Sequence, residues 1–161
     1  MLKKFFFVLT LAMSLFFTAC NKSEKCQYTT TTAVAPAAEV ANLKAWLDAN
    51  SLPYTQHPSG FFYKVISPGA GSTASVCSDV TVKYSGRVNT SSAPFDQNTA
   101  GVTFTLGQLI PGWQIGIPLI QKGGSIILYI PPTLGYGSTG SGAAIPPNSN
   151  LVFTIELLNV Q

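Results

Sequence analysis

The side chains that enzymes most often use for proton transfer and nucleophilic attack are sparse in this sequence. His57 is the only histidine, and it lies in the turn-like segment 56–60 (QHPSG), so we interpret it as a surface turn residue. No Ser-His-Asp set and no pair of acids at catalytic spacing is visible. The six acids are scattered singly along the chain at Glu24, Glu39, Asp48, Asp79, Asp96 and Glu156.

Aromatic and branched side chains at turns and strand ends offer a different chemistry, because they can line an apolar pocket. They occur in seven short phrases, which follow one another between about residues 76 and 161. The phrases are residues 82–86 (VKYSG), 95–96 (FD), 104–107 (FTLG), 109–113 (LIPGW), 134–137 (LGYG), 145–148 (IPPN) and 151–153 (LVF).

In this order and at these distances, the phrases resemble the FKBP family of peptidyl-prolyl cis-trans isomerases. The resemblance implies an α+β fold, in which a curled antiparallel β-sheet wraps around a short α-helix and leaves a hydrophobic pocket between them. It implies that Asp96 lies at the pocket edge near the rotating amide and that Tyr136 hydrogen-bonds a substrate carbonyl. It places Trp113 at the floor, with walls from Tyr84, Phe95, Phe104, Leu109, Ile110, Ile145 and Phe153.

Each pocket residue also has a purely structural interpretation, since aromatic residues on strands are more often core residues than ligand contacts. The sequence departs from the family pattern at Val102, where an aromatic residue is common, and loop 138–144 has no aromatic or histidine lid. Segment 89–94 is serine-rich and lacks the usual charged turn. We therefore keep three hypotheses: an isomerase of X–Pro bonds in exported proteins, an FKBP-like binding module or chaperone without useful catalysis, and an envelope assembly subunit.

The elements that must position these residues are mostly short β-prone runs separated by Gly, Pro and Ser. A short helix is expected over residues 112–120, with Pro118 cutting it short. Pro36 opens an amphipathic helix that ends near Asn50, with Val40, Leu43, Trp46 and Leu47 at helical spacing. Strands are predicted over residues 61–66, 80–88, 102–106, 125–130 and 151–160.

The N-terminus has the pattern of a secretory signal: Lys3 and Lys4 precede an apolar run, which ends near Cys20. Residues 17–20 (FTAC) resemble a bacterial lipobox, which implies that Cys20 is lipidated; ordinary signal cleavage is the alternative. We predict a signal peptide over 1–19, a flexible tether over 20–35, a helix and linker over 36–60 and an isomerase domain over 61–161. The protein is then lipid-anchored in the cell envelope, outside the cytoplasm, with a weak preference for the outer membrane.

Charge and composition narrow the set of partners. The net charge is +3, and removing Lys3 and Lys4 leaves seven basic residues against six acids, or +1, which is too weak a field to predict nucleic-acid binding. Expected partners are proline-containing polypeptides of the envelope, the membrane through the lipid, and macrolide-type inhibitors as the family implies. Cys26 and Cys77 could pair or stay free, and neither has metal-ligand spacing. We therefore expect no metal. The glycine-rich segments lack the P-loop spacing, and we expect no organic cofactor either.

Overall fold

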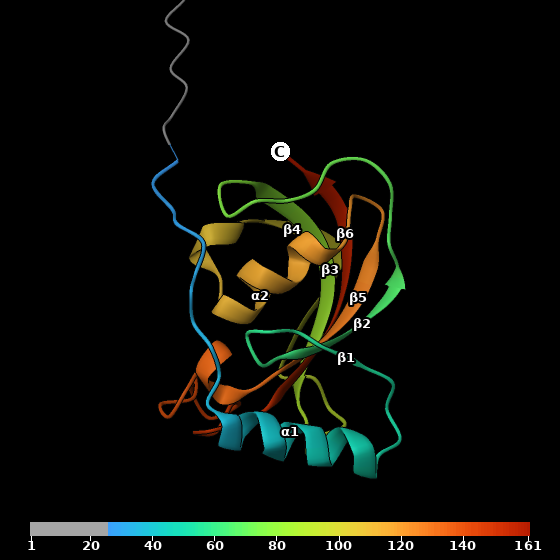
Figure 1. Ribbon diagram of the computed structural model, residues 1–161. Coiled ribbons are helices and arrows are strands. Elements are labelled where there is room, and N and C mark those ends of the chain that lie inside the picture. The colour runs from blue at the N-terminus through green and yellow to red at the C-terminus, as the bar shows by residue number, and fades with distance from the viewer. Residues whose placement is uncertain (1–25) are drawn as a thin grey trace, which may run out of the picture.

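The computed structural model describes residues 26–161, so the predicted signal peptide and Cys20 lie outside the described residues. One antiparallel sheet of six strands, in the order β1-β2-β5-β6-β3-β4, forms the frame of the molecule. Figure 1 shows its strands curving around a short helix. The strands are β1 (Thr55–Gln56), β2 (Phe62–Ser67), β3 (Asp79–Val88), β4 (Asp96–Thr105), β5 (Ser125–Ile130) and β6 (Leu151–Val160).

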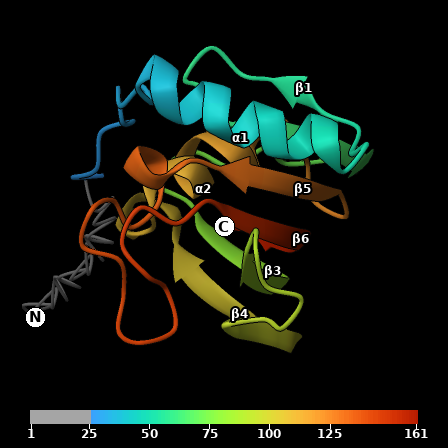
Figure 2. The ribbon, with the colours of Figure 1, turned by 90° about the horizontal axis from the view of Figure 1, so that it is seen from below.

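Apolar side chains on both faces of the central strands explain why the sheet is covered on two sides. Along β5, Ile126, Leu128 and Ile130 belong to the main core, whereas the alternate residue Tyr129 belongs to a second, smaller core. Side chains alternate across a strand, so a continuous apolar run needs a partner on each face. The helix α2 lies inside the curve of the sheet and α1 packs on the other side (Figures 1 and 2).

Helix α2 (Pro111–Gly116) is the short helix that the sequence predicts, although it ends earlier than residue 120. Pro111 occupies the first turn, where its missing N–H costs nothing. A 3-10 turn over Ile117–Leu119 contains Pro118 and replaces the rest of the predicted helix. The proline therefore shortens the helix, as expected from its lost hydrogen bond.

Helix α1 (Ala37–Ala49) confirms the predicted N-terminal helix, with Pro36 as its N-cap and Asn50 as its C-cap. Leu43 and Leu47 are fully buried and form the second core with residues on the outer face of β2, β5 and β6. This helix closes the face of the sheet opposite α2. No helix in the described part of the chain is long and apolar enough to cross a bilayer.

Residues 26–35 differ from the flexible tether that the sequence predicts, because they pack along the domain. Cys26 forms a disulfide with Cys77, with Cα atoms 5.5 Å apart. Ala35 is buried, and its N–H donates to the Ser59 carbonyl at 2.9 Å. The segment lacks the apolar periodicity of a regular element, and it is held by the disulfide and by small side chains that fit between neighbouring elements. We call residues 26–35 the N-terminal strap.

Candidate active site

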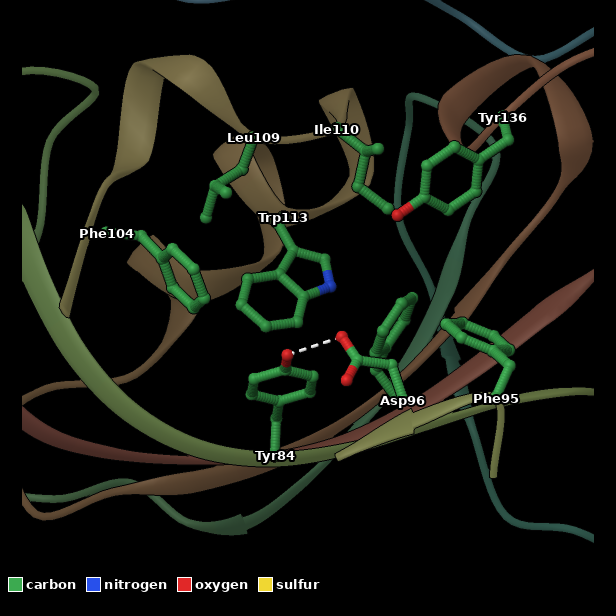
Figure 3. Close-up of a pocket in the computed structure, with 9 residues that line it drawn as sticks. Tyr84, Phe95, Asp96, Phe104, Leu109, Ile110, Trp113 and Tyr136 are labelled. Carbon is green, nitrogen blue, oxygen red and sulfur yellow. Dashed lines mark hydrogen bonds between the residues drawn. The ribbon is translucent and has the colours of Figure 1, made fainter. Parts of the chain in front are cut away.

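A pocket of about 180 Å³ opens where α2 faces β3 and β4. It brings together nine of the ten pocket residues named from the sequence, which come from six separate phrases of the chain. Asp96, Tyr136 and Phe95 are partly exposed at its rim, whereas Trp113 and Phe153 are buried beneath it. The lining residues are Tyr84, Phe95, Asp96, Phe104, Leu109, Ile110, Trp113, Tyr136 and Phe153 (Figure 3).

Ile145 is the one predicted wall residue that does not line the pocket. It is only 5% exposed and belongs to the main core. Its backbone N–H and carbonyl both pair with Ser141, at 3.1 and 2.8 Å. This pairing folds loop 141–145 back on itself, and the Ile145 side chain packs into the core instead of the pocket.

Trp113 forms the floor of the pocket, as the resemblance implies. Three aromatic rings meet its indole nearly at right angles. The ring centroids of Tyr84, Phe104 and Phe153 lie 5.3, 6.3 and 5.1 Å from that of Trp113, with interplanar angles of 82°, 82° and 88°. Phe95 meets Phe153 in the same way at 5.7 Å. Edge-to-face contacts of this kind stabilise a fixed arrangement of rings. The pocket is therefore built before any substrate arrives.

Gly86 on β3 makes room for two of these rings. A Cβ at this position would collide with the Phe153 ring and lie 2.9 Å from Phe95 Cζ. Gly86 also pairs with Asp96 across β3 and β4, which places the carboxylate at the rim. The glycine thus allows the rings of Phe95 and Phe153 to pack against β3. Gly86 belongs to the phrase VKYSG, but the sequence alone does not show that it has this role.

Tyr84 and Asp96 form the polar edge of the pocket. The Tyr84 hydroxyl donates a hydrogen bond to Asp96 Oδ2 at 2.5 Å, drawn as the dashed line in Figure 3. Burial, and next to it the hydrogen bond to the carboxylate, raise the pKa of Tyr84 to about 12. At neutral pH the hydroxyl is therefore a firm donor that holds the Asp96 side chain in place.

Tyr136 belongs to the glycine-flanked phrase LGYG, which follows the 3-10 turn Pro132–Leu134. Its side chain is 37% exposed, and its hydroxyl points inward over the pocket (Figure 3). Burial, and to a smaller degree the charge of Asp96, raise the pKa of this hydroxyl. Tyr136 thus presents a protonated donor to anything that enters the pocket.

Gln114 supports the opposite wall and was not identified from the sequence. Its Nε2 donates to the carbonyls of Gly107 and Leu109, at 3.2 and 2.7 Å. These bonds tie the loop that carries Leu109 and Ile110 to the first turns of α2. The available signal was a single polar residue inside the otherwise apolar helix PGWQIG.

The arrangement suits binding and orientation better than acid–base or nucleophilic chemistry. Asp96 is the only Asp, Glu, Lys, Arg or His side chain among the lining residues. Within residues 26–161 no three His, Cys, Asp or Glu side chains come together as a metal site. An apolar pocket with the Tyr136 hydroxyl and the Asp96 carboxylate at its rim can hold an apolar ring of a ligand and orient an amide group beside that ring.

Comparison with known proteins identifies the family. The profile of the FKBP-type peptidyl-prolyl cis-trans isomerases matches residues 71–158, more than half of the chain. The chain belongs to this family. A probable FKBP-type isomerase of Haemophilus influenzae is 44% identical over 105 residues, which are 63% of this chain and 43% of that protein. FkpA of Escherichia coli is 41% identical over 105 residues, or 64% of this chain and 38% of that protein. The matches thus span less than half the length of these FKBP relatives.

Solved structures of FKBP-type proteins share the fold. The crystal structure of Escherichia coli FkpA superposes with a TM-score of 0.69 and 35% identity, covering 78% of this chain and 60% of that one. A peptidyl-prolyl cis-trans isomerase from Pseudomonas syringae gives a TM-score of 0.68 and 29% identity, covering 79% of this chain and 97% of that one. The prediction of an FKBP-like α+β fold is confirmed.

Proposed function

We propose that this protein catalyses the cis-trans isomerisation of X–Pro bonds in exported polypeptides and so assists their folding. The observation that carries the proposal is the pocket itself: three aromatic rings pack against Trp113, Phe95 adds a fourth wall, and Tyr136 and Asp96 lie at the rim. Family membership supports the same activity. Substrates are polypeptides with an accessible proline, and macrolide-type inhibitors would occupy the same cup.

The reaction requires no covalent chemistry. Rotation about a peptide bond faces a barrier of roughly 18–20 kcal/mol, since resonance gives the C–N bond double-bond character. The two isomers of an X–Pro bond differ by only about 0.5–1 kcal/mol, so catalysis concerns the rate alone. A protein accelerates the reaction if it binds the twisted amide better than either planar form.

The lining residues divide this work between them. The Trp113 floor and its aromatic walls hold the prolyl ring and exclude water, which favours the less polar twisted amide. The Tyr136 hydroxyl donates to a substrate carbonyl and fixes the chain next to the proline. The Asp96 carboxylate, held by Tyr84, favours the twisted amide electrostatically.

We propose that the protein acts outside the cytoplasm, anchored by lipid on Cys20. The support is the signal-like N-terminus, the lipobox-like residues 17–20 and the Cys26–Cys77 disulfide, since disulfides persist in oxidising compartments. The strap begins six residues after Cys20, which keeps the domain close to the membrane surface. Labelling of cells with a radioactive fatty acid tests the anchor: label on the wild type that disappears in Cys20→Ser supports lipidation, and equal label on both contradicts it.

The isomerase activity is tested by measuring cis-trans exchange in a short X–Pro peptide. We expect the wild type to accelerate exchange. In Tyr136→Phe, kcat/KM should fall about two- to tenfold, because one neutral hydrogen bond to the substrate is lost. In Asp96→Ala, kcat/KM should fall about tenfold or more. Asp79→Ala is the matched control. The Asp79 carboxylate also accepts a hydrogen bond from a hydroxyl, that of Thr105 at 2.7 Å, but it lies at the end of the β3–β4 pair away from the pocket rim.

Two outcomes would count against the proposal. Absence of acceleration by the folded wild type, across several residues before proline, would favour an FKBP-like binding module or chaperone. Equal losses in Asp96→Ala and Asp79→Ala would show that the rim carboxylate has no special role. Far-UV and near-UV circular dichroism of each variant establishes that its fold is retained.

A further inference from the structure

The N-terminal strap contacts the domain beside the loop that carries the pocket wall. Figure 1 shows the strap descending beside the helices inside the sheet before it enters α1. Its first anchor is the disulfide between Cys26 and Cys77. Its second anchor lies two residues later, where Gln108 Nε2 donates to the Tyr28 hydroxyl oxygen at 2.6 Å.

The Tyr28 ring fits against Gly107. A Cβ at residue 107 would collide with Tyr28 Cγ, would approach Tyr28 Cβ to 2.6 Å and would lie 2.7 Å from the Val76 carbonyl oxygen. Gly107 is thus enclosed between the tyrosine ring and the segment that contains Cys77. The close fit buries part of Tyr28 and leaves no free space above this turn.

The turn under Tyr28 continues directly into the pocket wall. Gly107 N–H donates to the Val76 carbonyl at 2.8 Å, and Leu109 N–H donates to the Leu106 carbonyl at 3.1 Å. The next residues, Leu109 and Ile110, line the pocket. Ile110 is also the N-cap of α2, which carries Trp113. The contact made by Tyr28 is therefore one residue away from the wall of the site.

We infer that Tyr28 is a positioning residue for the Leu109–Ile110 wall, and that the Cys26–Cys77 disulfide keeps it in place. The effect on catalysis rests on the proposed isomerase function, but the positioning itself does not. The ring presses the 107–108 turn onto residues 76–78 from outside, while Gln114 holds the same loop from inside. Release of the strap removes the outer support and leaves the loop held by Gln114 and by the backbone hydrogen bond from Gly107 to Val76.

Hydrogen exchange tests the positioning directly on the complete, oxidised protein. In Tyr28→Ala, we expect the amides of Gly107 and Leu109 to exchange faster, while amides in the centre of β5 and β6 keep their protection. Tyr28→Phe keeps the ring over Gly107 and should show a smaller change. Reduction of the wild type should reproduce the Tyr28→Ala pattern, and Cys77→Ser should not respond to reductant.

Steady-state kinetics with an X–Pro peptide tests the consequence for the site. The wall holds the ring in the ground and transition states alike, so Tyr28→Ala should raise KM about two- to tenfold and leave kcat unchanged. Tyr54→Phe is the matched control: its hydroxyl bonds Asp48 at 2.7 Å, and Tyr54 packs in the second core on the other side of the sheet. It should leave KM and the exchange pattern unchanged.

The inference is overturned if Gly107 and Leu109 exchange at wild-type rates in Tyr28→Ala, or if exchange accelerates uniformly over β5 and β6, because the tyrosine would then act only on global stability. A fall in kcat with unchanged KM would also contradict a positioning role. Failure of the proposed function is distinguishable: the wild type would be inactive, and the exchange pattern alone would then decide whether Tyr28 positions the wall.

Discussion

Two tyrosine hydroxyls and one carboxylate supply the polar chemistry of a pocket that is otherwise aromatic and aliphatic. Tyr84 bonds Asp96, and Tyr136 approaches from a separate loop. Burial raises the pKa of both hydroxyls, so each keeps its proton at neutral pH. At the residue scale the site therefore places two protonated hydroxyls beside an apolar pocket, and the titration of these hydroxyls should be visible only in strong base.

The raised pKa of Tyr84 predicts a loss of stability in alkali. Its folded-state pKa of about 12 exceeds the ordinary value of 10.0, so between these values the unfolded chain releases a proton that the folded protein retains. The stabilisation is complete below pH 10 and is lost as pH rises toward 12. Urea unfolding from pH 8 to 12 should show a shallower decline for Tyr84→Phe than for the wild type. Parallel declines would contradict the assignment.

Nine pocket residues could be predicted because the phrases that carry them recur in a fixed order, which encodes their positions on strands and turns. Ile145 could not, since the same residue type in the phrase IPPN suits a pocket wall or a core, and the pairing with Ser141 decides between them. The supporting role of Gln114 could not be predicted either, because its side chain bonds to backbone carbonyls whose positions depend on the fold. The polar roles of Asp96 and Tyr136 remain predictions until the exchange rates are measured.

At the scale of elements, α2 can lie deep inside the curved sheet because two glycines face β5. A Cβ on Gly112 would lie 2.7 Å from Ile130 Cδ1, and one on Gly116 would lie 2.6 Å from Leu128 Cδ1. Residues four apart share one face of a helix, so the pair forms a flat surface against the strand. This close approach sets the depth at which Trp113 forms the pocket floor.

Gly116→Ala is therefore expected to destabilise the protein despite the higher helix propensity of alanine. The added methyl group overpacks the contact with Leu128, which typically costs about 1–3 kcal/mol of unfolding free energy. Urea unfolding measures the cost. Leu128→Ala removes the colliding atoms, so the double variant should be more stable than the sum of the single effects predicts. Strict additivity would show that the glycine face does not determine the packing.

Strands with regularly placed apolar residues could be predicted closely, and the polar half of β4 could not. The bounds of β5 and β6 agree with the prediction, because β5 is a continuous apolar run after Ser125, and β6 starts with the buried run LVF and then alternates buried apolar with exposed polar residues. The prediction missed the first half of β4, which begins at Asp96 and not at Val102, because this half (DQNTAG) is polar. It also contains a shift of register, next to which Asn98 Oδ1 accepts a hydrogen bond from Gly101 N–H at 2.7 Å. The two-residue β1 has no sequence signal of its own.

The whole molecule has the sheet as its middle layer, with α2 and the pocket on one face and α1 on the other (Figure 2). Leu43 and Leu47 of α1 are fully buried against Phe62, Tyr129 and Val152. The disulfide links residues 51 positions apart and encloses α1, β1 and β2 in one covalent loop. Residues 26–70, which precede the family match, are thus part of the folded body.

Leu47→Ala should accordingly cost about 2–5 kcal/mol of unfolding free energy, as expected for a buried leucine. Ile66→Ala is the control, because the Ile66 side chain is 54% exposed and its loss should cost much less. Urea unfolding compares the two, and similar small costs would show that α1 is only loosely attached. Folded Leu47→Ala should retain wild-type exchange activity, since the pocket lies on the other face of the sheet.

The single-domain architecture could be predicted from length and from the phrases, whereas the attachment of residues 26–35 could not. With Cys20 assigned to lipid, as the sequence predicts, Cys77 is the one partner left for Cys26, but the pairing depends on a distance that the sequence leaves open. Tyr28 stands in a threonine-rich segment without apolar periodicity, and only the space left by the missing side chain of Gly107 explains where its ring lies. Such contacts between segments that are distant in the sequence depend on the shape of the folded domain.

The measurement that tests the central claim most directly is exchange spectroscopy by NMR on an Ala–Pro peptide with a catalytic amount of the protein. A catalyst that stabilises the twisted amide must accelerate cis-to-trans and trans-to-cis rotation by the same factor and leave the two populations unchanged. We predict this result for the wild type, with a smaller factor in Asp96→Ala. Peptide binding without any change in the two exchange rates would contradict the claim and identify the pocket as a binding site alone.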